Sequence, residues 1–255
     1  MVSSRRLFIP LYAASGTAAL VYEVTWTRLL TLQLGHTVAA ASTVLAAFMG
    51  GLAVGAWLAG RLVTRRDAAG RAPHPIPNLR AYAVLELVVA GSALLLPLAL
   101  AASVPALAWA YADGAAPSRF ALVRIAISLA LLGVPAAAMG ATFPIAADWF
   151  AGGTDPQAAG VLYASNTAGA AIGAIGAGFF LVPALGLRAT TWVGVVLNVA
   201  AAAGAWWLST QQPTMNAEIA ESAENMSVRC LCALRTLRSY YVTDRDEYAN
   251  ASGDW

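Results

Sequence analysis

At residues 81–102 the chain reads AYAVLELVVAGSALLLPLALAA, 22 residues with a single charged side chain, Glu86. A helix of about 20 mostly apolar residues is long enough to cross the hydrocarbon core of a bilayer. Other stretches have the same character, so the sequence predicts six membrane-spanning helices. They lie at residues 7–27, 38–60, 81–102, 121–143, 158–182 and 189–208. Residues 26–35, interrupted by Arg28 and Gln33, either extend the first helix or lie along the outer surface of the membrane.

The composition of the whole chain agrees with this prediction. Of the 255 residues, 59% are hydrophobic and 11% are charged, and the mean hydropathy is +0.66. A soluble domain has about 25% charged residues, so this chain has too few to cover a water-exposed surface. A disordered chain is excluded, because such chains are poor in apolar residues and rich in charge. We therefore expect an all-α, polytopic membrane protein, a six-helix bundle whose main partner is the lipid bilayer.

Charge and cysteine content exclude several further classes of function. The net charge of +2 leaves no basic stripe that could follow a nucleic-acid backbone, so we expect no nucleic-acid partner. The two cysteines, Cys230 and Cys232, are too few for a disulfide framework and lack the second ligand pair of a zinc site. We expect neither a metal site nor a cofactor.

Arginines outside the predicted spans orient the bundle, because cytoplasmic loops carry an excess of basic residues. One side holds Arg5, Arg6, Arg61, Arg65, Arg66, Arg71 and Arg80, and the other holds Arg28, Arg119 and Arg188. We therefore expect the N-terminus, the second loop and the C-terminal tail to be cytoplasmic. The chain would consist of a transmembrane domain at residues 1–209 and a polar tail at residues 210–255, in which apolar residues spaced by three and four predict one amphipathic helix.

Small residues recur at intervals of four in two of the predicted spans. They are Gly51, Gly55 and Ala59 in the second span, and Gly169, Gly173 and Ala177 in the fifth. Lipid supplies no hydrophobic force between helices, so close backbone approach must hold a membrane bundle together. We expect both stripes to be packing seams. The run GAAIGAIGAG at residues 169–178 is not a dinucleotide fingerprint, because it lies in the middle of a span and not after a strand.

Glu23, Glu86 and Arg124 are ionisable side chains inside the predicted spans. Insertion scales put the cost of such a residue at about 2.5–3.5 kcal/mol, so each needs a partner or a function. With a rise of about 1.5 Å per residue, Glu23 and Arg124 fall at similar heights in the outer leaflet. We expect them to form an ion pair, with Arg28 as a competing partner. The pair would be either a static clamp or part of a proton- or substrate-linked site.

The other polar residues of the spans receive simpler interpretations. We expect Glu86, close to the cytoplasmic side, to reach the interface or to pair with Arg80 or Arg61. Asn166 and Asn198 are expected to form hydrogen bonds between helices. The candidate binding residues are therefore Glu23, Arg28, Arg124 and Asn166, and no residue is assigned to catalysis.

Several short motifs follow one another along residues 7–208. They are YEVTWTRLL at 22–30, LGHT at 34–37, MGATFP at 139–144, LYASNTAG at 162–169 and GLR at 186–188. In this order they resemble the fused spermidine-synthase-like membrane proteins. The resemblance implies a helical module of the bacterial inner membrane, which in the fused members precedes a cytosolic aminopropyltransferase domain of methyltransferase-like fold.

A second likeness concerns the predicted second loop, GRLVTRR at residues 60–66. Through Gly60, Arg61 and Arg65 it is similar to the loop motif that follows the second helix of major facilitator transporters. Six spans would then correspond to one half of such a transporter. Thr64 stands where that motif normally has an acidic residue, so the gating interaction of that acid is not expected here.

About 45 residues follow the last predicted span, too few for a nucleotide-type catalytic domain. The resemblance therefore implies the membrane module alone, a split-gene product or a truncated form, without catalysis by this chain itself. Such a module would anchor a separate aminopropyltransferase, or pass a small or cationic metabolite to it. The alternative is a transporter half that pairs with a second copy of itself to enclose a substrate path. A purely structural partner protein is a third interpretation.

Overall fold

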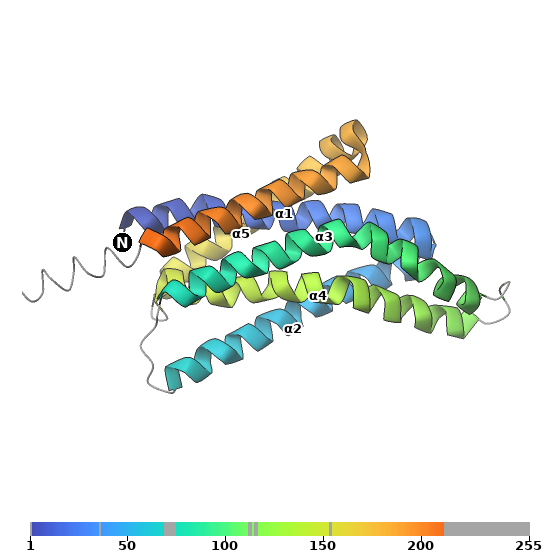
Figure 1. The fold of residues 1–255 in the computed structure, drawn as a ribbon, viewed down its shortest axis with the longest axis horizontal. Coiled ribbons are helices and arrows are strands. Elements are labelled where there is room, and N and C mark those ends of the chain that lie inside the picture. Colours follow the sequence, from blue (N-terminus) through green and yellow to red (C-terminus); the bar gives the residue numbers. More distant parts are fainter. Residues whose placement is uncertain are drawn as a thin grey trace, which may run out of the picture. The chain divides into compact units, whose positions relative to one another are not determined.

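The fold is taken from a computed structural model that describes residues 2–35, 37–68, 75–111, 114, 117–152 and 155–211. Within these ranges the chain is helical and contains no strand. The elements are α1 (Val2–Leu34), α2 (Val38–Ala68), α3 (Pro75–Tyr111), α4 (Pro117–Ala151), α5 (Pro156–Ile175) and a π-helical turn, η2 (Gly176–Leu181). A further helical run follows at residues 182–211. Figure 1 shows these helices packed lengthwise beside one another.

Five long apolar helices in the described ranges are candidate membrane spans, consistent with a multi-pass membrane protein. They are Ser4–Leu34, Val38–Arg65, Asn78–Tyr111, Pro117–Ala151 and Pro156–Gln211. The predicted count of six differs because the last two predicted spans, 158–182 and 189–208, fall in one helical stretch of 56 residues. The outer surface is apolar, as a lipid-facing surface must be: Leu98, for example, is 70% exposed and Phe179 is 75% exposed.

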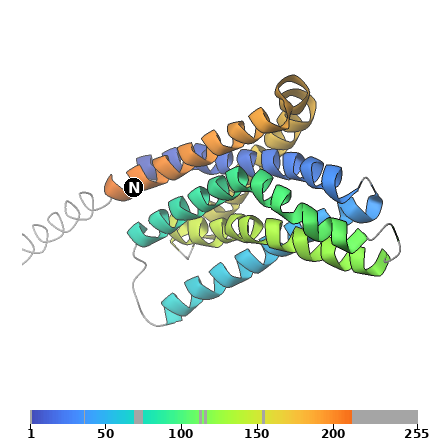
Figure 2. The same cartoon turned by 45° about the vertical axis from the view of Figure 1, so that its right-hand side comes forward.

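The stretch Pro156–Gln211 reverses its direction near Gly186. Gly186 has φ +77°, a left-handed conformation that glycine adopts without strain. Before the reversal, Gly169 and Gly173 pack against Ala13 and Thr17, so α5 runs parallel to α1. After it, the contacts of residue 194 with Tyr22 and of residue 204 with Leu11 show that the chain runs antiparallel to α1. Figures 1 and 2 show the same course, as the chain passes from yellow to orange.

The helices are longer than the predicted spans. Residues 26–35, for which the sequence left two alternatives, extend α1 as far as Leu34. Helix α3 begins at Pro75, six positions before the predicted span, and continues through Pro105 to Tyr111. Proline suits the first turn of a helix, since the amide proton that it lacks has no partner there. At the junction of α3 and α4, Arg119 donates to the backbone oxygens of Trp109 and Ala110 at 3.0 and 3.3 Å.

Close backbone contacts join the helices in pairs. A Cβ atom on Gly55 of α2 would collide with the backbone of Ala137 of α4, and one on Gly140 of α4 would collide with the backbone of Leu52. Gly51 faces the same seam, where a Cβ atom would lie 2.6 Å from the Cβ atom of Ala136. Glycine is therefore needed where α2 and α4 cross, as it is where α1 meets α5.

The chain divides into two compact units, Met1–Thr210 and Gln211–Trp255. The described residues cover almost all of the first unit and only Gln211 of the second. The amphipathic helix predicted in the tail lies outside the described residues.

Candidate functional site

Two apolar clusters fill the bundle, and one polar residue separates them on each of four helical segments. Ser15 on α1 lies between Tyr12 and Ala18, and Glu86 on α3 lies between Ala83 and Val89. Thr142 on α4 lies between Ala138 and Ala146, and Asn198 in the run at residues 182–211 lies between Val195 and Ala202. In each pair the two neighbours belong to different clusters. We call these four residues the polar layer. Because the layer crosses the inside of an apolar bundle, its polar groups need hydrogen-bond partners within the bundle.

Glu86 is the centre of the polar layer and is 1% exposed. The Ser15 hydroxyl donates to its Oε1 at 2.5 Å, and the Asn198 amide Nδ2 donates to its Oε2 at 2.6 Å. Asn198 Nδ2 also reaches the backbone oxygen of Glu86 at 3.3 Å. Each carboxylate oxygen thus has one donor, both donors are neutral, and the buried Tyr82 hydroxyl is a third neutral polar group beside the carboxyl. Among the described residues no cation forms an ion pair with Glu86.

The prediction that Glu86 reaches the interface or pairs with Arg80 or Arg61 is wrong. Arg80 lies over the ring of Trp206 at 5.5 Å, and Arg61 lies over the ring of Trp57 at 4.0 Å. The physical reason is the face of α3 on which Glu86 lies. Its side chain is buried inside the bundle and accepts from Ser15 of α1 and from Asn198, so it does not reach the surface.

A cavity of about 120 Å³ lies beside Glu86. Its polar lining consists of the four residues of the polar layer together with Asn166 of α5. The volume is far above the roughly 10–15 Å³ that one water molecule needs. Asn198 Oδ1 is buried and has no hydrogen-bond partner within the described residues. Thr142 donates to the backbone oxygen of Met139 at 2.6 Å, and its side chain also interacts with that of Tyr12. The amide of Asn166 adds both an acceptor and N–H donors to the lining.

Asn166 lies against α1 at Gly16, where a Cβ atom would be 2.7 Å from Asn166 Oδ1. Next to it, the Thr17 hydroxyl donates to the backbone oxygen of Gly169 at 3.0 Å and ties α1 to α5. Of the two asparagines expected to form hydrogen bonds between helices, Asn198 does so. Asn166 forms none with another residue in the described part of the chain, although it lines the cavity.

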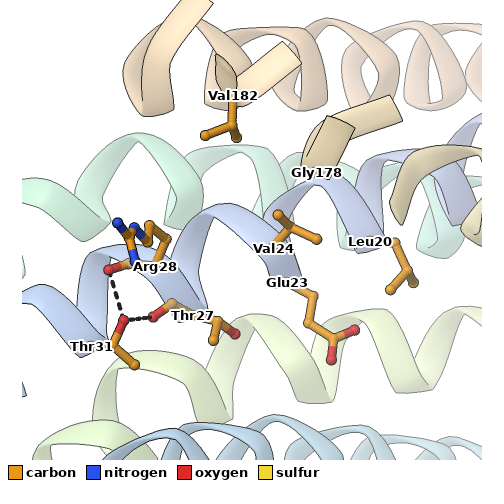
Figure 3. Close-up of a pocket in the computed structure, with 8 residues that line it drawn as sticks. All are labelled: Leu20, Glu23, Val24, Thr27, Arg28, Thr31, Gly178 and Val182. Carbon is orange, nitrogen blue, oxygen red and sulfur yellow. Dashed lines mark hydrogen bonds between the residues drawn. The ribbon is translucent and has the colours of Figure 1, made fainter. Parts of the chain in front are cut away.

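Three of the predicted binding residues lie elsewhere. Glu23 and Arg28 line a second cavity of about 490 Å³, with Thr27 and Thr31 of α1 and two residues of the η2 region. Figure 3 shows this groove, with the Thr31 hydroxyl donating to the backbone oxygens of Thr27 and Arg28. Arg124 lines another groove, together with Gln33 and Thr37, residues from the far end of α1 and the start of α2.

The predicted ion pair between Glu23 and Arg124 is therefore wrong within the described residues. The height estimate assumed that the first helix ends near residue 27, whereas α1 continues to Leu34. Arg124 is level with Leu34, which is 11 residues, or about 17 Å, farther along α1 than Glu23. Its guanidinium lies 5.7 Å from the ring centre of Phe120 instead.

No family model, curated protein or solved structure matches the chain.

The GRLVTRR motif at residues 60–66 is not a loop. It forms the last turns of α2, which continues to Ala68 because no glycine or proline breaks the helix after Gly60. Arg61 and Arg65 are exposed on this end of α2. The described residues contain no group of three histidine, cysteine or acidic side chains that could hold a metal ion.

Sequence reasoning missed the polar layer, although each of its members was visible. The signal is one polar residue near the middle of each of four apolar helices, at positions 15, 86, 142 and 198. Finding it requires the true helix ends, because the depth of a residue can only be compared between helices whose starting points are known.

Proposed function

We propose that this chain is an integral membrane module that binds a small cationic metabolite inside its helical bundle and supports polyamine-related synthesis by a separate aminopropyltransferase. One observation carries the proposal: the Glu86 carboxyl is enclosed in the bundle with two neutral donors and no counter-ion among the described residues. Burying an acid in an apolar bundle is costly, and such residues in membrane proteins usually serve binding or transport.

The charge of Glu86 supports a cationic ligand. Ser15 and Asn198 satisfy hydrogen bonds of the carboxyl group, but neither neutralises its charge. Apolar residues of similar volume would pack in this position at lower cost. A ligand that brings a positive charge into the cavity would remove the cost of the unpaired carboxylate. The resemblance to the spermidine-synthase-like membrane proteins favours a polyamine as this cationic metabolite.

The topology that we propose has six membrane crossings. A straight helix of 56 residues would be about 84 Å long, nearly three times the thickness of the hydrocarbon core. The reversal at Gly186 allows Pro156–Gln211 to cross twice. The arginine asymmetry then favours cytoplasmic termini, and the resemblance favours the bacterial inner membrane and a relation to one half of a major facilitator transporter.

The test is binding of labelled spermidine to the purified chain in lipid nanodiscs, alone and after co-expression with an aminopropyltransferase. We expect saturable binding to the chain alone and co-purification of the enzyme. Decarboxylated S-adenosylmethionine and putrescine should give no product with this chain alone. Absence of spermidine binding to folded protein contradicts the proposed polyamine role.

A transporter half is the second candidate, and the groove at Glu23 and Arg28 favours it. This groove of about 490 Å³ opens between α1 and the η2 region, on a side that a second copy of the chain could cover. The two candidates differ in uptake: proteoliposomes that contain only this chain should accumulate labelled spermidine under an ion or proton gradient if the chain is a transporter. No uptake under any gradient, with binding retained, favours the module that serves a partner enzyme.

A further inference from the structure

We propose that the cavity beside Glu86 binds one primary ammonium group, recognised by its N–H donors. The two oxygens of the Glu86 carboxylate and Oδ1 of Asn198 form the binding site. This inference rests on the proposed function and deepens it, since it assigns the binding to particular atoms and gives the ligand a chemical class.

The acceptors of the site match the donors of an ammonium group in number. An ionised carboxylate has about four lone-pair sites on its two oxygens, and Ser15 and Asn198 Nδ2 use one site on each oxygen. Asn198 Oδ1 adds a third acceptor atom that has no partner within the described residues. An –NH₃⁺ group carries three N–H donors. One ammonium group would therefore satisfy all three atoms at once.

The orientation of the Asn198 amide follows from the two acceptors of Glu86 that it faces. Nδ2 donates to Glu86 Oε2 at 2.6 Å and to the Glu86 backbone oxygen at 3.3 Å. The reversed amide would place its oxygen against two acceptors, which is unfavourable. While Glu86 is ionised, Oδ1 of Asn198 thus accepts no hydrogen bond from the described residues. Leaving such an atom buried and unpaired costs about 1–3 kcal/mol, which a donor in the cavity would recover.

The lining of the cavity argues against divalent metal ions and quaternary ammonium groups. Calcium takes 6–8 oxygen ligands and magnesium a strict octahedron, whereas this site offers one carboxylate and a few neutral oxygens. A quaternary ammonium group has no N–H donor for Asn198 Oδ1. The apolar part of the lining, with Phe48, Leu52 and Met139, suits the alkyl carbons next to an ammonium nitrogen.

The experiment is isothermal titration calorimetry of the full chain in nanodiscs with methylammonium chloride, at constant ionic strength. We expect one saturable site per chain, and no saturable binding of tetramethylammonium. Absence of methylammonium binding to folded wild-type protein, or equal binding of tetramethylammonium, overturns the proposal.

Variants connect the binding to the named atoms. Glu86→Gln keeps the volume of the side chain and removes its charge, and should weaken methylammonium binding at least about tenfold. Asn198→Ser removes Oδ1 together with the Nδ2 donor to Glu86 and should also weaken methylammonium binding, so the proposal remains testable if Glu86→Gln does not fold. The control is Asp148→Asn, which removes a carboxylate that accepts from Asn78 at 2.5 Å, outside the cavity. It should bind methylammonium as the wild type does. Unchanged binding in folded Glu86→Gln overturns the proposal.

The same proteins separate this inference from the proposed function. Equal spermidine binding by wild type and Glu86→Gln would leave the proposed function standing and overturn the ammonium site. Methylammonium binding that depends on Glu86, without spermidine binding, would support the ammonium site and contradict the polyamine role.

Discussion

The Ser15 hydroxyl and the Glu86 carboxylate, 71 positions apart in the chain, form a hydrogen bond of 2.5 Å between α1 and α3. Both side chains are buried, and the bond lies between the two apolar clusters of the bundle. Asn198 holds the other carboxylate oxygen from the run at residues 182–211. Three helical segments thus meet at one carboxyl group, and this group determines how they fit together.

Replacing Ser15 with alanine should destabilise the protein. The change removes the donor to Glu86 Oε1, and an unsatisfied buried polar group costs about 1–3 kcal/mol. Thermal unfolding in detergent or nanodiscs measures the loss. Ser103→Ala is the matched control, because Ser103 donates to Leu100 of its own helix at 2.7 Å, and it should unfold at nearly the temperature of the wild type. Equal stability of the two variants would show that the bond to Glu86 is not important for folding.

Replacing Gly55 with alanine should separate α2 from α4. The new methyl group would collide with the backbone of Ala137, and such overpacking costs about 1–3 kcal/mol. Gly50→Ala, in the same helix, meets no atom within 4 Å and should be neutral or slightly stabilising. The readout is the unfolding temperature of both variants. If Gly50→Ala is as harmful as Gly55→Ala, the seam between α2 and α4 does not account for the effect.

Replacing Gly186 with alanine should cost about 1–3 kcal/mol, because its φ of +77° is strained for a residue with a Cβ atom. Gly176→Ala is the control in the same stretch, since Gly176 has φ −58° and no atom within 4 Å of an added Cβ. The difference in unfolding temperature between the two variants reports on the backbone conformation alone. A harmless Gly186→Ala would place the reversal of direction elsewhere in the stretch.

The proposed double crossing of Pro156–Gln211 can be tested by cysteine labelling. Cys230 and Cys232 are first replaced by serine, and a single cysteine is then introduced at Leu185 or at Thr64, both exposed. With a membrane-impermeant maleimide on intact spheroplasts, we expect labelling at position 185 and none at position 64 until the membrane is permeabilised. Labelling of both positions from the same side rules out the proposed topology.

Much of the fold could be predicted from the sequence, because long apolar stretches have few alternatives to membrane helices. The helix ends could not be predicted, since a helix continues past the hydrocarbon core wherever no residue stops it, as α1 does as far as Leu34. This error in length misplaced Glu23 relative to Arg124. The packing seam at Gly51 and Gly55 could be predicted without the helix ends, because a spacing of four places the two glycines on one face wherever the helix begins.

The polar layer also determines how the helices align along their axes. Between purely apolar surfaces, neighbouring helices can shift along their axes, because each apolar contact that is lost is replaced by another of similar free energy. If α3 shifted by one turn, the Glu86 carboxyl would leave Ser15 and Asn198 and enter an apolar cluster, where an unpaired polar group costs several kcal/mol. A single polar residue inside a coiled coil fixes its register in the same way. The residues that would hold a ligand therefore also fix the axial register of the helices when the bundle assembles.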